Sequence, residues 1–315
     1  MVIGGIMEQK NDIFEFVVTD EYEGMRIDKL ISELVDSLSR TYIKKLIDDK
    51  KVFCNGKNVK PSTSVSENDR IYLEIPPLEV PEILPQDIPL DILYEDEDVL
   101  VVNKPKNMVV HPAAGHYKDT LVNAIMFHCK DNLSGINGVM RPGIVHRIDK
   151  DTTGSVIICK NDKAHQSIAE QLKDHSINRV YHAIVYGIIK EDEGDVTAPI
   201  GRSANDRKKM AVVNGGKYAS THYKVIKRFP EDGFTYIECK LKTGRTHQIR
   251  VHMSHIGHPL LGDEVYAAGR KSRFKLNGQC LHAKILGFIH PLTGDYIETD
   301  APLPEYFSHL LEVLK

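Results

Sequence analysis

The sequence predicts an α+β fold with a mixed, mostly antiparallel central sheet, preceded by a small α/β module. Segments with helical and with strand spacing do not alternate regularly along the 315 residues, as they would in a doubly wound sheet. Turn residues are frequent, and several strand-like runs are rich in Val, Ile, Tyr and Thr. A Pro-rich, acidic segment separates a short first part from a long second part.

This segment divides the chain. We expect an N-terminal tail at residues 1–21, of which residues 1–20 could instead form an edge strand, a small module at 22–75, a linker at 76–90 and a large domain at 91–315. The linker is predicted from its prolines, which favour extended backbone and remove hydrogen-bond donors.

Composition excludes several classes of protein. A hydrophobic content of 41% supports a real core and argues against wholesale disorder. No run approaches the roughly 18 apolar residues of a membrane helix, and the apolar start is too short for a signal peptide. The five cysteines are far apart and form no C-x-x-C pair, which argues against a disulfide framework or a thiolate zinc site. We therefore expect a cytoplasmic protein, without a membrane partner, and a monomer.

The distribution of charge is more informative than its total. Residues 71–100 hold nine acidic residues and no Lys or Arg. Without those nine charges, the formal net charge of −3 becomes +6 for the rest of the chain. Basic surfaces on either side of an acidic connector are compatible with a nucleic-acid partner.

The small module contains two helices and then strands. Apolar residues in 26–35 have helical spacing, and a second helix begins after Ser39, a suitable N-cap. Two short apolar runs then meet at Asn55-Gly56, a strong hairpin signal. A polar loop and a closing strand, DRIYLEI, complete the module.

Basic residues concentrate in this module. Seven of them lie between positions 40 and 60: Arg40, Lys44, Lys45, Lys50, Lys51, Lys57 and Lys60. One helix could present several of them to a phosphate backbone. For an isolated basic helix, an ordinary solvated face is the commoner explanation.

The order of elements favours RNA binding. RIDKLI, SRTYIKKLI, VFCNGK and DRIYL together resemble the ribosomal S-four-type RNA-binding domain over about fifty residues. In that family the second helix and the following loop meet RNA. By position, the resemblance implies RNA contacts at Arg40, Thr41, Lys44, Lys45 and Lys57.

In the large domain, 98–105 and 154–160 are predicted as buried strands, and 162–175 as a surface helix. Residues 178–189, 217–228 and 234–243 are predicted as further strands.

The most informative segment is RPGIVHRIDKDTTG, residues 141–154. An apolar pair is followed at once by a turn in which three basic residues lie near two acidic ones. An aspartate near guanidinium groups has its charged form favoured, so Asp149 suits an ionised nucleophile or acceptor. For a D-x-T segment in general, an Asx turn or N-cap is the commoner role.

HRIDKDTTG resembles the H-R-L-D-x-x-T-S-G signature of RluA-type RNA pseudouridine synthases, with Ile148 for Leu and Thr153 for Ser. The resemblance implies the pseudouridine synthase fold and makes Asp149 the catalytic residue. It also implies that Arg147 enters the space vacated when a uridine leaves its stack.

Other segments match the family in order. LVVNKPKNMVVHP (100–112) resembles the opening strand and turn. RVYHAIVYG (179–187) resembles the K-x-Y-x-A-x-V-x-G strand, which implies that Tyr181 packs against the target base; Arg179 stands where lysine is usual. LKTGRTHQIRVHMSHIGHPLLGD (241–263) resembles the motif whose basic residue, here Arg250, pairs with the catalytic aspartate. The two-domain arrangement and GINGVMRPGIVHRID resemble the RluD-like branch, which implies uridines of large-subunit ribosomal RNA as substrate.

The third motif also has a physical interpretation. Thr246 could cap a helix whose residues Ile249, Met253 and Ile256 pack on the core. His247, Arg250 and Ser254 would lie on another face, available to a site. The guanidinium fork of an arginine could bind a carboxylate through two parallel hydrogen bonds.

Other chemistries are less well supported. His247, His252, His255 and His258 suggest a metal-dependent hydrolase, but they lack the H-E-x-x-H spacing and nearby thiolates. The sequence has neither a P-loop nor a dinucleotide fingerprint, so we expect no nucleotide cofactor. Two further basic clusters could extend a phosphate path: Arg202, Arg207, Lys208 and Lys209, and Arg270, Lys271, Arg273 and Lys275.

The sequence therefore predicts an isomerase that converts specific uridines of RNA to pseudouridine without a cofactor or metal. The expected catalytic residues are Asp149, Arg250 and Tyr181, with Arg147, His146 and His247 as substrate-binding residues. Whether Asp149 attacks the nucleotide or assists cleavage is open. An RNA-binding ribosome-assembly factor without catalysis remains the alternative from another class.

Overall fold

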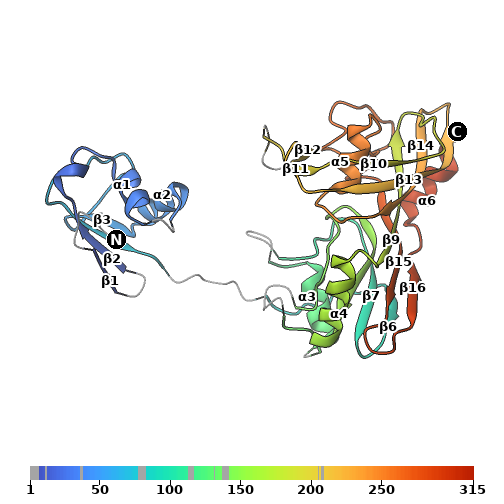
Figure 1. Cartoon of the computed structure of the whole chain (residues 1–315), viewed down its shortest axis with the longest axis horizontal. Coiled ribbons are helices and arrows are strands. Elements are labelled where there is room, and N and C mark those ends of the chain that lie inside the picture. Colours follow the sequence, from blue (N-terminus) through green and yellow to red (C-terminus); the bar gives the residue numbers. More distant parts are fainter. Residues whose placement is uncertain are drawn as a thin grey trace. The chain divides into compact units, whose positions relative to one another are not determined.

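The structure is a computed structural model, and it describes residues 7–10, 13–35, 38–76, 83–112, 117–130, 132–136, 142–204, 206 and 209–315. The chain divides into two compact units, Met1–Pro81 and Glu82–Lys315. Figure 1 shows the helices and strands of each unit.

The first unit packs two helices on a small antiparallel sheet. Its elements are β1 (Met7–Lys10), β2 (Ile13–Val17), the 3-10 turn η1 (Asp20–Tyr22), α1 (Ile27–Leu34), α2 (Arg40–Asp48), β3 (Val52–Cys54), β4 (Lys57–Asn58) and β5 (Arg70–Glu74). The strand order is β1-β2-β5-β3-β4. Its core joins the apolar faces of both helices to the inward residues of the strands.

Local sequence signals explain this unit. The Ser39 side chain accepts a hydrogen bond from the backbone N–H of Tyr42, as expected of an N-cap. Asn55 and Gly56 both have positive φ, which a tight two-residue hairpin turn requires.

The segment predicted as a tail or an edge strand contains two strands, β1 and β2. Residues 13–17 form β2, which pairs with β5, and Phe14 and Phe16 on it are buried. Alternation of apolar and polar residues in IFEFV gives a strand whose apolar side belongs to the core. Residues 1–6 and 11–12 lie outside the described part of the chain.

The second unit contains β6 (Ile92–Glu95), β7 (Val99–Lys104), α3 (Leu121–Cys129), β8 (Thr153–Cys159), α4 (Asp162–Lys173), β9 (Asn178–Tyr186), β10 (Glu193–Thr197), β11 (Ile200–Arg202), β12 (Met210–Val212), β13 (Ser220–Phe229), β14 (Phe234–Leu241), α5 (Gln248–His255), β15 (Leu281–Ile289), β16 (Tyr296–Asp300) and α6 (Glu305–Val313). The order in its large sheet is β10-β13-β14-β9-β15-β8-β7-β6, and β16 pairs with β15. The pair β8–β15 is parallel and the others are antiparallel, which confirms the predicted α+β class with a mixed, mostly antiparallel sheet.

Helices cover both faces of this sheet. Alternate strand residues, such as Leu100 and Val156, pack with α3 and α5, whereas Val99 and Ile157 pack with α4 on the opposite face. α6 covers a separate apolar cluster formed by β9 and β14. The long apolar strands are therefore buried on both sides, which fits their nearly continuous hydrophobic sequence.

Part of the predicted linker, residues 76–90, packs on the second unit. Ile83 is buried in the large core, and residues 84 and 86 hydrogen-bond to Asn123 of α3. The second half of 76–90 therefore packs on the second unit, because Ile83 buries an apolar side chain there. Residues 77–82 lie outside the described part.

Candidate active site

Residues from several segments line one cavity of about 340 Å³. Residues 145–149 and 152 come from the loop before β8, and Arg179 and Tyr181 come from β9. The loop 244–247 and the start of α5 form much of the remaining wall, which is completed by three leucines of α4, β14 and β15: Leu172, Leu241 and Leu281. All six residues that the sequence predicted for this domain line it: Asp149, Arg250, Tyr181, Arg147, His146 and His247.

Hydrogen bonds within the turn and from two other segments hold the turn that carries Asp149. The backbone N–H of Thr152 donates to the Asp149 carbonyl at 3.1 Å, and the buried ammonium of Lys104 donates to the Lys150 carbonyl at 3.0 Å. Gln279 donates to the Thr152 hydroxyl at 2.9 Å. A turn held from two other segments keeps its carboxylate in one position, which chemistry at a fixed substrate atom requires.

Asp149 and Arg250 are in direct contact. Arg250 Nη1 donates to Asp149 Oδ2 at 2.8 Å, and the Asp149 side chain remains 21% exposed to the cavity. Burial opposes the charge of Arg250, but the neighbouring carboxylates outweigh it and raise the pKa of the guanidinium.

Arg250 makes its two parallel hydrogen bonds to Asp263, and not to the carboxylate that was predicted, Asp149. Its Nε and Nη2 donate to the two oxygens of Asp263 at 2.7 and 2.9 Å, whereas Asp149 receives one hydrogen bond. Asp263 also accepts from the backbone N–H groups of Val265 and Tyr266. The sequence reasoning missed this partner, although Asp263 ends the LLGD run of the third motif.

Helix α5 begins differently from the prediction. Its N-cap is His247, in the left-handed region at φ +56°, and Thr246 does not cap it. The side chain of Gln248 instead accepts from the backbone N–H of Arg245 at 2.9 Å and from the Thr243 hydroxyl at 2.7 Å. The predicted packing of the helix is confirmed.

Ile249 and Met253 are buried in the large core, and Ile256 packs against it.

His247 lies between two partners. Its Nδ1 is 2.9 Å from the Tyr266 hydroxyl, and its Nε2 is 3.7 Å from Asp149 Oδ1. Burial lowers the pKa of His247, although the Asp149 charge opposes this.

His146 is committed to the backbone. Its Nε2 accepts from the N–H of Ile157 at 3.0 Å, which joins the loop to the adjacent strand β8. Burial lowers its pKa to about 3, and the charge of Arg179 adds to this effect. The ring is therefore neutral at neutral pH, with Nδ1 carrying the proton.

Tyr181 lies on the floor of the site. Its side chain is 8% exposed and points to the same face of β9 as Ala183 and Val185 in the core. Burial raises the pKa of its hydroxyl, so the ring is neutral at physiological pH. Arg147 is exposed on the loop that carries Asp149.

The histidines that suggested a metal are dispersed. The ring of the fully buried His252 lies 2.9 Å from the Thr221 hydroxyl and 3.0 Å from the Ala198 carbonyl, and His258 contacts the Tyr186 carbonyl. These contacts agree with structural histidines rather than with a shared metal centre.

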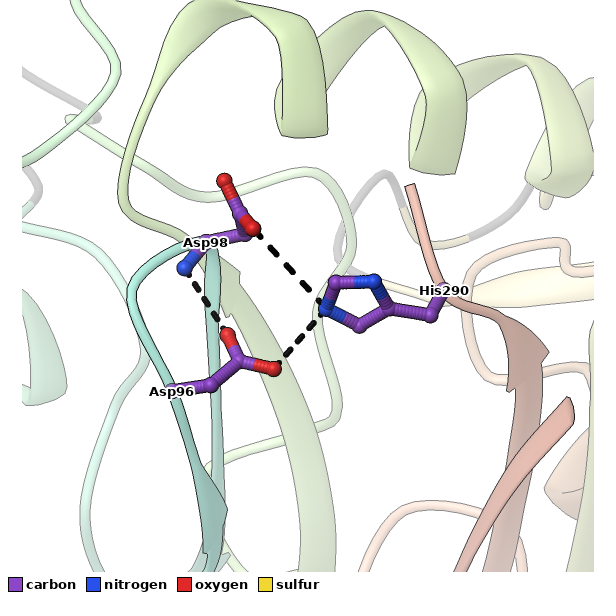
Figure 2. Close-up of side chains that lie close together, drawn as sticks. All are labelled: Asp96, Asp98 and His290. Atoms are coloured by element: carbon purple, nitrogen blue, oxygen red, sulfur yellow. Dashed lines mark hydrogen bonds and ion pairs between the residues drawn. The ribbon is translucent and has the colours of Figure 1, made fainter. Parts of the chain in front are cut away.

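One group with the geometry of a metal site lies elsewhere. Asp96, Asp98 and His290 bring their ligand atoms within 4.8 Å of one another, as Figure 2 shows. His290 Nδ1 accepts from two backbone N–H groups, so its Nε2 carries the proton and donates to Asp96 Oδ2 at 2.8 Å. The hydrogen bonds of this group thus join the end of β15 to the turn between β6 and β7.

The predicted RNA-contact residues of the first unit are exposed. Arg40, Thr41, Lys44 and Lys45 lie on α2 and Lys57 on β4, all with exposed side chains. Arg40 also donates to Asp28 at 3.1 Å. Of the second basic cluster, Arg207 and Lys208 lie outside the described residues. The third cluster is exposed, and Arg273 within it pairs with Asp232.

Comparisons with known proteins identify the class. Residues 98–255 match the family described as RNA pseudouridylate synthase, and residues 25–71 match the S4 domain. These two matches coincide with the cavity-bearing unit and with the small helical module.

Relatives that match along most of their length and of this chain point to the same class of protein. The chain is 50% identical over 301 residues to a protein of Bacillus subtilis named "Uncharacterized RNA pseudouridine synthase YlyB", covering 96% of this chain and 98% of the relative. It is 48% identical to "Ribosomal large subunit pseudouridine synthase D" of Zymomonas mobilis, covering 95% and 97%. The solved structure titled "Human RNA Pseudouridylate Synthase Domain Containing 1" aligns with a TM-score of 0.56 at 26% identity, covering 69% of this chain and 84% of that one.

The chain therefore belongs to the RNA pseudouridylate synthase family. It is an isomerase with an S4 RNA-binding domain at its N-terminal end. The family predicted from HRIDKDTTG is confirmed. No helix in the described part of the chain is long and apolar enough to cross a membrane.

Proposed function

We propose that this protein isomerises specific uridines of large-subunit ribosomal RNA, with Asp149 as the catalytic carboxylate. The observation that carries the proposal is the carboxylate itself: it lies in a cavity, fixed by Arg250 at 2.8 Å, with Tyr181 in the same wall. The ribosomal substrate is supported by relatives named for the large ribosomal subunit.

The reaction rearranges the atoms of one nucleotide. The bond between ribose C1′ and uracil N1 breaks, and both electrons leave with the base. The base turns in the cavity, C1′ bonds to C5, the proton of C5 is lost and N1 gains a proton. The balance needs no oxidant, reductant or group donor, so the proposal includes no cofactor.

Each side chain has a role in this scheme. Asp149 adds to the nucleotide or assists departure of the base, and Arg250 orients its carboxylate through the 2.8 Å hydrogen bond. Tyr181 supplies a stacking face for the uracil. Extrusion of a base costs roughly a few kcal/mol, and Arg147, exposed on the adjoining loop, offsets part of this by filling the gap. His146 and His247 complete the binding wall.

The first unit supplies affinity. Exposed Arg40, Lys44, Lys45 and Lys57 contact phosphates, while the cavity selects the base. We further propose that the protein acts as a cytoplasmic monomer, with RNA binding by the first unit, which includes residues 22–75, and catalysis by the second, which includes residues 91–315.

The test compares pseudouridine maps of total RNA from cells with the gene, without it, and with Asp149→Asn. Wild type should restore specific pseudouridines in large-subunit RNA, and Asp149→Asn should restore none while binding RNA normally. Arg250 keeps Asp263 as a partner in this variant, so the protein should fold. Restored sites in Asp149→Asn would remove the catalytic role from Asp149, whereas pseudouridine maps that are the same with and without the gene would favour a protein that only binds RNA.

A further inference from the structure

Arg179 on β9 is a buried cation that no role above uses. The residue is only 7% exposed, and its Nε and Nη2 have no hydrogen-bond partner among the residues that the structure describes. It lines the same cavity as Asp149 and lies two residues before Tyr181, on the same face of the strand.

No carboxylate in the described part of the chain neutralises this charge. In the described residues Arg179 takes part in no ion pair, whereas Arg250 in the same cavity contacts two carboxylates. Burial lowers the pKa of Arg179. An unpaired buried ion disfavours the folded state, so its presence in a cavity that receives substrate points to an anion that arrives with the substrate.

The chain leaves room for the guanidinium at Gly244. A Cβ added there would lie 2.6 Å from Arg179 Nη1, and no backbone strain requires glycine at this position because its φ lies outside the left-handed region. Gly244 itself lines the cavity. Arg179 and Gly244 therefore form one fitted part of the wall.

Two groups of the substrate carry negative charge. A phosphodiester belongs to the RNA backbone, which stays at the solvent side of the cavity. The detached uracil carries its charge inside the cavity, shared among N1, O2 and O4, because the electrons of the broken C1′–N1 bond leave with the base. A side chain as deeply buried as that of Arg179, beside the stacking tyrosine, suits the second group.

We propose that Arg179 donates hydrogen bonds to a carbonyl oxygen of the detached uracil, stabilising its negative charge while the base turns between N1 and C5. The inference rests on the proposed function and deepens it. The donor is fixed before the charge develops, which is the arrangement that lowers a barrier most. Loss of one such donor typically slows the chemical step by about 10²- to 10³-fold.

The experiment uses the full chain and RNA labelled with [5-³H]uridine, prepared from cells lacking the gene. Bond formation at C5 releases tritium, so single-turnover release with excess enzyme reports the chemical step at whichever uridine is modified. Arg179→Met should slow release by about 10²-fold or more, with the dissociation constant for RNA and its salt dependence unchanged. Its melting temperature should equal or exceed that of wild type, because an apolar side chain replaces an unpaired ion.

Three further variants separate the explanations. Arg179→Lys restores a cation and should recover at least tenfold of the rate. Gly244→Ala displaces the guanidinium and should slow release without changing RNA affinity. Lys224→Met removes an exposed charge from the same sheet and should match wild type.

A wild-type rate in Arg179→Met would overturn the inference. Weaker RNA binding with an unchanged saturated rate would also overturn it, since a phosphate contact would be responsible. A lower melting temperature without rescue by lysine would show a structural role. Absence of tritium release by wild type would instead refute the proposed function itself.

Discussion

Asp263 offers the sharpest test of how the site is built. It is completely buried and accepts four hydrogen bonds: two from Arg250 and two from backbone N–H groups at the start of the next loop. Asp263→Asn preserves the volume but replaces one acceptor oxygen by an NH₂ group. That group cannot accept from the guanidinium, so at least one N–H of Arg250 loses its partner.

The magnitude follows from these contacts. Breaking a buried ion pair by removing one partner costs about 3–5 kcal/mol, and Arg250 keeps one carboxylate, Asp149 at 2.8 Å, so the lower end applies. A loss of about 3 kcal/mol lowers the melting temperature of a domain of this size by roughly 6–12 °C. Because Arg250 also loses its fixed orientation, the rate of isomerisation should fall by about tenfold or more.

Thermal melting and tritium release, both measured on the full chain, check this prediction. Asp195→Asn is the matched control, since Asp195 pairs with Lys242 at 2.9 Å and the two side chains are 49% and 55% exposed. An exposed pair contributes about 0–1 kcal/mol, so the control should melt within a few degrees of wild type and react normally. If Asp263→Asn also melts and reacts like wild type, Arg250 does not depend on Asp263 and the reasoning is wrong.

Three other predictions concern the rest of the chain. Lys44→Gln combined with Lys45→Gln should lower the slope of log affinity against log salt by about 1.4 to 1.8, measured by RNA titration; an unchanged slope would exclude phosphate contacts there. His282 is fully buried and its pKa is lowered by burial to about 4, so below pH 6.5 the unfolded chain takes up a proton that the folded chain does not. Stability should therefore fall by about 1.4 kcal/mol per pH unit between 6.5 and 4, and urea titrations of His282→Gln should show a shallower fall. Gly154→Ala should destabilise by about 3 kcal/mol or more in the same titrations, because φ is +107° and the new Cβ would lie 2.3 Å from the Ala283 carbonyl oxygen; a loss below 1 kcal/mol would contradict this.

Much of the fold could be predicted because the relevant signals are local. The Ser39 cap, the Asn55-Gly56 hairpin and the strands rich in β-branched residues depend on neighbours within a few positions, where sequence acts directly on backbone conformation. At β2 the choice between a tail and an edge strand stayed open, because a run of five residues carries too short a pattern to distinguish the two.

The site divides in the same way. The sequence determined which side chains meet: a turn rich in charge marked Asp149, and the resemblance of the later motifs placed Arg250 and Tyr181 beside it. The tertiary structure alone decided how they are held. Asp263 receives the guanidinium fork, His247 begins α5, and Arg179 is buried without a counter-ion among the described residues. These features depend on distances between segments that are far apart in the chain, and such distances are set by packing of the sheet and helices rather than by any local pattern.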